Sequence, residues 1–297
     1  MFVKGTPVCF AMLLALCLVS SGLAEEQRFT TIDFPCASDT GAFGINSRGD
    51  IVGDYDRDQH GFLLSKGHFT TIDFPGASAT AGRGINREGD IVGLYCLEGT
   101  IPTLCNRTGL HGFLVSQGTF TTVDVPGASS TAAFAINSDG DIVGDYSTTT
   151  GPCAAVPGAG CHGFLLSKGT FTTIDVPGAL GTMARGISPE GNIVGFYLNA
   201  TGFHGFLFSN GAFITIDITA PDALSALIFS INPAGSIVGS SNGGFLLRRG
   251  AFSSIDFPGA DVTLPLGINS EGAIVGFYFT GPFATATIHG FLLSKHH

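Results

Sequence analysis

The stretch GINSRGDIVGDYDRDQHGFLLSKGHFTTIDFPGA, residues 44–77, contains the complete pattern from which this chain is built. Near copies of it follow one another along the 297 residues. The FTTID segment or a near copy begins at Phe29, Phe69, Phe120, Phe171, Phe213 and Phe252. The spacings are 40, 51, 51, 42 and 39 residues, and self-similarity at a period of roughly 20–50 residues is typical of solenoids and propellers.

Each copy contains four short segments with the composition of β-strands, at GIN, DIVGxY, HGFLLS and FTTID. Residues 46–49 fit a type I turn, and Lys66-Gly67 fits a two-residue hairpin turn. Four short strands in about 40–50 residues match one propeller blade. The sequence therefore predicts an all-β fold, a six-bladed β-propeller with four short antiparallel strands per blade. A β-solenoid, which has shorter coils, and an outer-membrane barrel, whose strands have about 9–11 residues, fit less well.

The two ends of the repeat region lack complementary strands. No HGFLL strand precedes the first FTTID, residues 29–33, and no FTTID strand follows the last HGFLLSK, residues 289–295. Together these two segments would complete one blade. We therefore expect the N-terminal strand to pair in the last blade, which closes the ring and covers its open sheet edge.

Residues 1–24 have the pattern of a secretory signal peptide, and residues 25–297 form the predicted single propeller domain. Lys4 supplies the positive start, residues 8–19 an apolar run, and Ala24 the small residue before cleavage. A membrane anchor is the alternative, but this run is shorter than the roughly 20 residues of a spanning helix. We expect a monomer without a membrane span that is secreted, periplasmic or attached to the cell surface.

The composition excludes several classes of protein. Only 12% of the residues are charged and 44% are hydrophobic, and the mean hydropathy is +0.37, whereas disordered chains combine high charge with low hydrophobicity. The 44 glycines exclude long helices. The formal net charge of -10 would repel the phosphates of a nucleic acid, which is therefore not an expected partner.

Two of the seven cysteines lie in the signal segment. Export to an oxidising compartment favours disulfides. Two local disulfides are predicted, Cys96 with Cys105 and Cys153 with Cys161, each closing its own loop. Zinc is the alternative, but these segments lack the close CxxC spacing that favours it. Cys36 is left over, either as a buried thiol or as an intermolecular bridge.

The predicted hairpin register places His60 opposite Asp73 on the outer strand pair. The same count pairs His111 with Asp124, His162 with Asp175, His204 with Asp217 and, across the chain ends, His289 with Asp33. In the fifth repeat Gly243 takes the position of the His. These pairs could be acid–base dyads or repeated structural hydrogen bonds. Chemistry rarely needs so many copies, so the structural interpretation is favoured.

Tyrosine occurs at only one position of the repeat, which indicates a packing role with the hydroxyl at the wet end of the strand. The residues are Tyr55, Tyr95, Tyr146, Tyr197 and Tyr278.

One segment has calcium-like spacing and resembles the loops of integrin-type propeller repeats. Its candidate ligands are Asn137, Asp139, Asp141 and Asp145. The glycine expected after the fifth position is replaced by Ile142, and sister repeats lose ligands. A plain hairpin turn is therefore favoured, and no cofactor is expected.

The unit GIN..GDIVG.Y…HGFL.S.G.FTTIDFPGA resembles the HAF-type extracellular repeat family of bacteria over nearly all of residues 29–295. The resemblance implies a secreted, propeller-like protein without a catalytic motif. This chain has HGF where many such repeats have AF.

Between Tyr and His the repeats insert 4, 15, 15, 6 and 10 residues. Variable loops on one propeller face are where binding usually occurs. The candidate binding residues are Tyr55, Asp56, Asp58, Glu98 and Asp145. A binding scaffold for an extracellular polymer or protein is favoured over a propeller-type carbohydrate hydrolase or lyase, because no catalytic motif and no Trp are present. A structural surface or matrix component is the third alternative.

Overall fold

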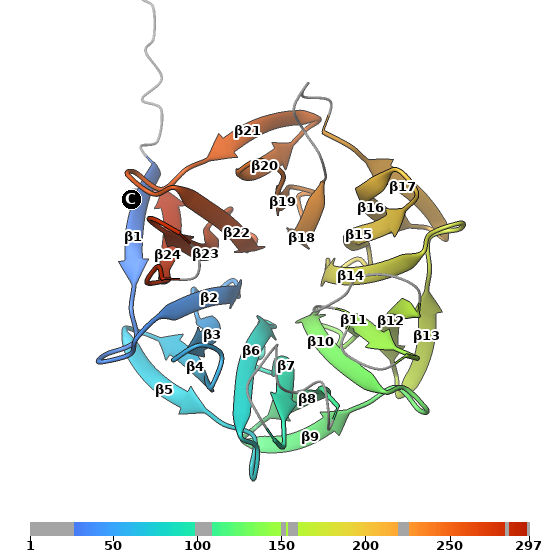
Figure 1. Cartoon of the computed structure of the whole chain (residues 1–297), viewed down its shortest axis with the longest axis horizontal. Helices are drawn as coiled ribbons and strands as arrows, with labels where there is room; N and C mark the ends of the chain where they lie inside the picture. Colours follow the sequence, from blue (N-terminus) through green and yellow to red (C-terminus); the bar gives the residue numbers. More distant parts are fainter. Residues whose placement is uncertain are drawn as a thin grey trace, which may run out of the picture.

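The computed structural model describes residues 27–98, 109–149, 153, 160–218, 226–282 and 285–295. Residues 1–24, with the expected signal peptide, lie outside this part of the chain. The strands form an all-β propeller around a central axis (Figure 1). Within the described ranges, we find no helix with the length and apolar character needed to cross a membrane.

Each repeat forms four antiparallel strands, and we call each such group a blade. The innermost strands are β2 (Thr40–Ile45), β6 (Ala79–Ile85), β10 (Ser130–Ile136), β14 (Gly181–Ile187), β18 (Leu227–Ile231) and β22 (Val262–Ile268). The second strands are β3 (Ile51–Tyr55), β7 (Ile91–Cys96), β11 (Ile142–Ser147), β15 (Ile193–Asn199), β19 (Ile237–Ser240) and β23 (Ile274–Phe279).

The third strands carry the HGF motif: β4 (His60–Ser65), β8 (His111–Ser116), β12 (Cys161–Ser167), β16 (Gly202–Ser209), β20 (Gly244–Arg248) and β24 (His289–Lys295). The outer strands are β5 (His68–Ile72), β9 (Thr119–Val123), β13 (Thr170–Ile174), β17 (Ala212–Ile216), β21 (Ala251–Ile255) and β1 (Gln27–Ile32). The four strands predicted for each repeat are therefore confirmed.

Four sheets have four strands each, and one of these has the order β1-β24-β23-β22. In it β1 pairs antiparallel with β24 from Gln27↔Lys295 to Ile32↔Gly290. A fifth sheet has eight strands. It consists of the groups β10–β13 and β14–β17, joined by a parallel pairing of only Cys161 with Gly181.

The two turns predicted from the repeat are present. Gly49 N donates to Asn46 O at 3.1 Å, as a type I turn requires. Lys66 and Gly67 have φ values of 51° and 78°, which is the left-handed geometry of a type I′ hairpin turn. Ser65 accordingly pairs with His68, so the hairpin register read from the sequence is confirmed.

The core lies between neighbouring blades. The Phe of the HGF motif is nearly inaccessible to solvent in each blade, as the 0% exposure of Phe62 illustrates. Its ring lies over the Gly of the IVG segment, where an added Cβ on Gly53 would come within 2.7 Å of the Phe62 ring. The same Cβ would overlap the backbone oxygen of Gly41 in the neighbouring strand, so this position requires glycine.

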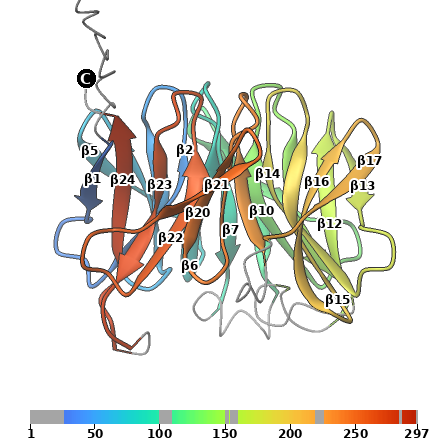
Figure 2. The same ribbon diagram turned by 90° about the horizontal axis from the view of Figure 1, so that it is seen from above.

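The strands run between two end faces (Figure 2). We call the end with the turns between first and second strands, such as Asn46–Gly49, the turn face. The opposite end carries the Tyr-to-His loops and is called the loop face.

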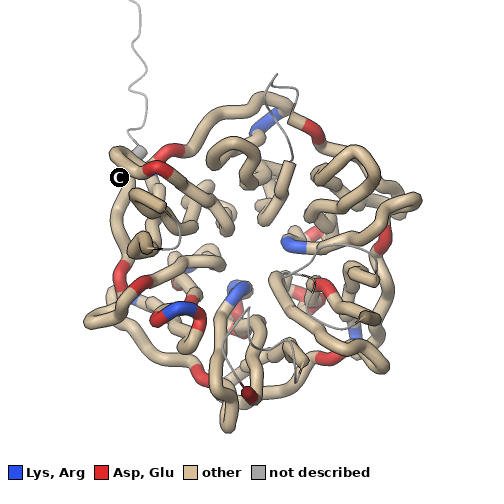
Figure 3. Tube along the Cα trace, viewed as in Figure 1, with Lys and Arg blue, Asp and Glu red and all other residues tan. Residues whose placement is uncertain are grey.

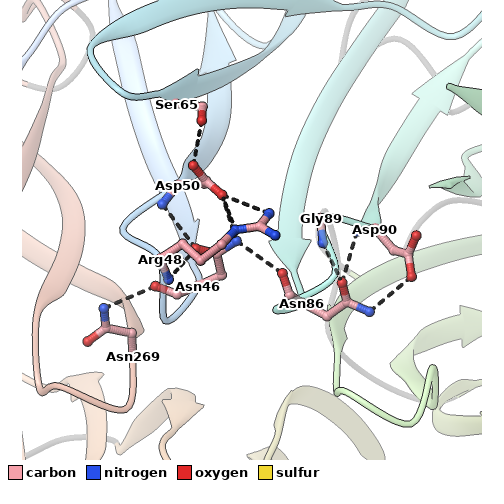
Figure 4. Close-up of polar contacts among 8 residues, drawn as sticks. All are labelled: Asn46, Arg48, Asp50, Ser65, Asn86, Gly89, Asp90 and Asn269. Atoms are coloured by element: carbon pink, nitrogen blue, oxygen red, sulfur yellow. Dashed lines mark hydrogen bonds and ion pairs between the residues drawn. The ribbon is translucent and has the colours of Figure 1, made fainter. Parts of the chain in front are cut away.

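A belt of asparagines links blades at the turn face (Figure 4). Asn46 Nδ2 donates to Asn86 O at 3.1 Å, and Asn86 Nδ2 donates to Asn137 O at 3.3 Å. Asn232 donates to Asn269 O at 3.0 Å, and Asn269 donates to Asn46 O at 3.1 Å. The last bond joins residues separated by 223 positions. The asparagine of GIN therefore forms hydrogen bonds between neighbouring blades.

Candidate functional site

Each innermost strand contains a β-bulge directly before its GI or equivalent segment. The register shifts between Ala42 and Gly44 in β2 and between Gly82 and Gly84 in β6. Equivalent shifts occur in the other innermost strands. A bulge leaves one residue outside the ladder and re-aims its side chain. The bulged residues are Phe43, Arg83, Phe134, Arg185, Phe229 and Leu266.

All of these bulge residues line one cavity on the propeller axis, which we call the axial cavity. Its volume is about 260 Å³. The remaining lining residues are Asp58, Leu94, Leu110 and Phe196. Asp58 and Leu110 belong to Tyr-to-His loops, so the axial cavity lies toward the loop face. Two further spaces follow along the axis toward the turn face. The first is smaller, about 100 Å³, and the second is larger, about 670 Å³.

Only two of the bulge positions are basic, and they appear as the inner basic positions of β6 and β14 in Figure 3. Arg83 Nη1 donates to Asp54 Oδ2 at 2.7 Å, and its Nη2 lies 3.6 Å from Asp58 Oδ1. Its guanidinium carbon lies 3.7 Å from the centroid of the Phe43 ring. We call Phe43, Arg83, Asp54 and Asp58 the first arginine module.

The second arginine module is Phe134, Arg185 and Asp145. The Arg185 guanidinium lies 3.7 Å from the Phe134 ring centroid and 5.2 Å from that of Phe196. Arg185 Nη1 and Asp145 Oδ2 are 3.0 Å apart. Among the described residues neither atom has a hydrogen-bond partner, so the pair is held by charge without a well-directed hydrogen bond. In both modules the Phe and Asp come from one blade and the Arg from the next.

Burial perturbs the charged groups of both modules. The pKa of Asp54 lies well above its usual value because burial disfavours the charged form and Asp58 adds like charge, while Arg83 acts in the opposite direction. Burial also raises the pKa of Asp145, against the attraction of Arg185. For the same reason the pKa of Arg185 is lowered. Perturbed groups in a cavity are typical of functional sites.

The loop that carries Asp58 has an unusual backbone. Asp56, Arg57 and Asp58 have φ values of 54°, 58° and 61°, a left-handed conformation that costs a non-glycine residue roughly 1–2 kcal/mol. Hydrogen bonds hold this loop: Ser38 N donates to Asp56 Oδ1 at 2.7 Å, and Arg57 N donates to Asp39 Oδ1 at 2.7 Å. The surrounding structure thus fixes Asp58 at the cavity despite local strain.

The His–Asp contacts predicted from the register are present, with Nδ1 to carboxylate distances of 2.7–2.9 Å. They join His60 to Asp73, His111 to Asp124, His162 to Asp175, His204 to Asp217 and His289 to Asp33. None of these residues lines the axial cavity.

Each tyrosine stacks on the histidine of its own blade and bonds a threonine of the outer strand. Tyr55 lies 5.2 Å from the His60 ring centroid, and its hydroxyl is 2.9 Å from Thr71 Oγ1. The same contact places Tyr278 Oη 3.0 Å from Thr31 Oγ1 of β1. Tyr55, a candidate binding residue, is buried in the core, its hydroxyl contacts the outer strand of its own blade, and it does not line the axial cavity.

The other candidate binding residues separate in the structure. Asp58 lines the axial cavity, and Asp145 lies behind Arg185 as its ion-pair partner. Asp56 accepts a hydrogen bond from Ser38 N, which stabilises its loop. Glu98 is exposed and does not line the cavity.

The structure does not gather the four candidate calcium ligands. Asn137 Oδ1 accepts bonds from Asp139 N and Asp141 N at 3.0 and 2.9 Å, as a capped turn does. Asp145 lies four residues farther along extended chain, about 13 Å from Asp141 at the usual rise per residue, and faces Arg185. The geometry therefore gives calcium no support at this turn.

One predicted disulfide, Cys153–Cys161, is present, with a Cα–Cα distance of 5.5 Å. Cys96 is also disulfide-bonded, but its predicted partner Cys105 lies outside the described residues. Cys36 is exposed, which excludes the buried-thiol alternative.

The sequence interpretation missed the arginine modules, although the repeat contains a signal for them. The residue before Tyr is Asp in two copies, Asp54 and Asp145, and the next copy then has Arg at its bulge position, Arg83 or Arg185. The other copies have neither residue at those positions. This coupling within one chain predicts a contact between blades.

Comparison with protein-family models gives no match, and comparison with curated protein sequences gives none. Solved structures do resemble this chain. A protein described as a "putative gluconolactonase" has a TM-score of 0.54 and 14% identity, covering 91% of this chain and 92% of that one. Virginiamycin B lyase from Staphylococcus aureus has a TM-score of 0.51 and 11% identity, covering 85% of this chain and 82% of that one. Identities this low establish a shared propeller fold and nothing about activity.

Proposed function

We propose that this protein is a secreted binding scaffold that uses its loop face to engage an extracellular polymer or protein. The scaffold is a six-bladed ring closed by β1, with the groups β10–β13 and β14–β17 counted as separate blades. The pairing of β1 with β24 supports closure, and the pattern of residues 1–24 supports secretion. Membership of the HAF-type repeat family is part of the same proposal.

The observation that carries the proposal is the ring of bulge residues. Most positions of the repeat serve the blade, as the buried phenylalanines and the His–Asp contacts do. The bulge positions instead differ between blades, running Phe, Arg, Phe, Arg, Phe and Leu, and all six residues line one cavity. A cavity with apolar walls and a few polar groups is the usual form of a ligand site.

The cavity also opens toward the face with the variable loops. Asp58 and Leu110 line it from two of these loops. The disulfide residues Cys153 and Cys161 pack with Phe196 at the same face. Loop variation around a rigid cavity allows one scaffold to change its ligand without changing the blades.

The experiment compares the wild type with Leu266→Trp, which fills the axial cavity. Both proteins are applied to glycan and peptide arrays and screened for small-molecule binding by thermal shift. We expect wild-type ligands that Leu266→Trp loses while its melting temperature and circular dichroism remain those of a folded protein. Equal binding by both proteins would remove the axial cavity from the site.

A trimmed variant tests the loops separately. Replacing residues 97–110 by a short Gly-Ser linker should weaken binding of the same ligands. Mass spectrometry of each bound ligand after incubation tests the hydrolase or lyase alternative, because a scaffold returns its ligand unchanged.

A further inference from the structure

The first arginine module shows how the protein satisfies a guanidinium in the axial cavity. Asp54 binds Arg83 from the neighbouring blade at 2.7 Å and is only 5% exposed. Asp58 approaches the other nitrogen at 3.6 Å and lines the cavity itself. Arg83 therefore has one carboxylate behind it and a second carboxylate on its cavity side.

The second module has a counterpart of Asp54 behind its arginine but no counterpart of Asp58 on the cavity side. Asp145 lies 3.0 Å behind Arg185, and Phe134 supports the guanidinium at 3.7 Å. The loop that corresponds to the Asp58 loop comprises residues 148–160 and contains no acidic residue in the sequence. Arg185 also lines the axial cavity, with a side chain that is 10% exposed.

We propose that the axial cavity binds a small apolar monocarboxylate, whose carboxylate pairs with Arg185 in the way that Asp58 pairs with Arg83. Arginine presents its donors as a planar fork that matches a carboxylate, and such charge-assisted bonds are stronger than neutral ones. This inference rests on the proposed function, because both place the ligand in the axial cavity.

The residues that line the cavity favour a small, apolar tail on the carboxylate ligand. Leu94, Leu110 and Phe229 supply apolar surface for a hydrocarbon or aromatic tail. The volume of about 260 Å³ lies just below the roughly 300–1,000 Å³ of drug-sized pockets, which restricts the ligand to a small molecule. A polyol would place its hydroxyls against these walls without partners, which costs affinity.

Charge selects a monoanion. Of the charged residues that line the cavity, two are arginines, Arg83 and Arg185, and one is the carboxylate Asp58, so one further carboxylate balances the charge and a dianion would exceed it. A cationic ligand would approach two guanidinium groups on the cavity wall. A single carboxylate adds the one negative charge that the second module lacks relative to the first.

The test is calorimetric titration of octanoate into the full chain, with octanamide as the neutral probe of the same shape. We expect wild type to bind octanoate at least about tenfold more tightly than octanamide, the ratio for a charge-assisted bond of modest strength. Arg185→Gln should remove this preference and leave octanamide binding within about twofold. Circular dichroism checks that the variant is folded.

Asp58→Asn provides an independent test in case Arg185→Gln does not fold. It removes the internal carboxylate from Arg83, so octanoate should bind several-fold more tightly while octanamide binding stays the same. Absence of octanoate binding to wild type, or an unchanged preference in Asp58→Asn, would overturn the inference.

The result separates the inference from the proposed function. If octanoate and octanamide bind wild type equally and Leu266→Trp abolishes both, the carboxylate inference fails and the cavity remains the ligand site. If array ligands bind Leu266→Trp as they bind wild type, the proposed use of the cavity fails.

Discussion

The two arginine modules share the same contacts among Phe, Arg and Asp but differ in the number of carboxylates near the arginine. In both, a guanidinium on a β-bulge lies 3.7 Å from the preceding Phe ring and pairs with an Asp of the preceding blade. Arg83 has a second carboxylate from a strained loop, whereas in the described part of the chain Arg185 forms an ion pair with Asp145 alone, through an Nη1 atom that lacks a hydrogen-bond partner. The difference shows that the same bulge position can place an arginine between two carboxylates at one blade interface and beside a single carboxylate at another.

The largest expected effect comes from removing the cation of the second module. Arg185→Phe leaves Asp145 buried without a counter-charge, which should lower the free energy of unfolding by about 3–5 kcal/mol. The measurement is urea denaturation at neutral pH. The loss should shrink in acid, because the burial that raises the pKa of Asp145 also allows it to become neutral.

The chain itself supplies the control. At the preceding blade interface Leu94 occupies the Asp position and Phe134 the Arg position. The double variant Asp145→Leu/Arg185→Phe copies that pair and should recover most of the lost stability. If the double variant is as unstable as the single one, the charge pairing between blades is not the cause.

The disulfide beside the second module has the next largest effect. Cys153 and Cys161 pack with Met183 and Phe196, and their loop spans 8 positions. Replacing both by Ala should cost about 2–3 kcal/mol by the loop-entropy relation. Urea denaturation with and without a reductant measures the change. A wild type that is insensitive to reductant would contradict this prediction.

The pH dependence of stability measures the cost of burying Asp54 in the first module. Its pKa is raised in the folded protein, so the folded state binds more protons than the unfolded state above the usual value of 3.8. Stability should therefore fall as pH rises from about 4 through the raised pKa, by up to about 1.4 kcal/mol per pH unit for one proton. Asp54→Asn should flatten this slope, with Asp145→Asn as the matched variant from the second module. Unchanged slopes in both would show that these carboxyls are ionised as freely as in the unfolded chain.

Much of the fold could be predicted from the sequence because each local signal agreed with the others. Lys66-Gly67 fixed a hairpin register, and that register placed His60 beside Asp73, as the 2.9 Å contact confirms. The cavity could not be predicted in this way. A bulge adds one residue to a strand and reverses the side of the sheet to which its side chain points, and the alternating pattern around Phe43 gives no sign of that reversal. The coupling of Asp54 with Arg83 was readable, but only by comparing adjacent copies of the repeat.

The smallest expected effect concerns the loop that holds Asp58. Arg57 is left-handed at φ 58° and its side chain is 75% exposed, with Asp39 3.6 Å away. Such an exposed ion pair contributes little. Arg57→Gly should therefore raise stability by less than about 1 kcal/mol, because the relief of strain exceeds the cost of the added freedom of the unfolded chain by a small margin. Arg57→Val should lower stability, because β-branched residues are least tolerant of this conformation. Urea midpoints measured under identical conditions compare the two. Opposite signs would show that the first module keeps its second carboxylate at a conformational cost. Equal effects would mean that the left-handed loop is unstrained.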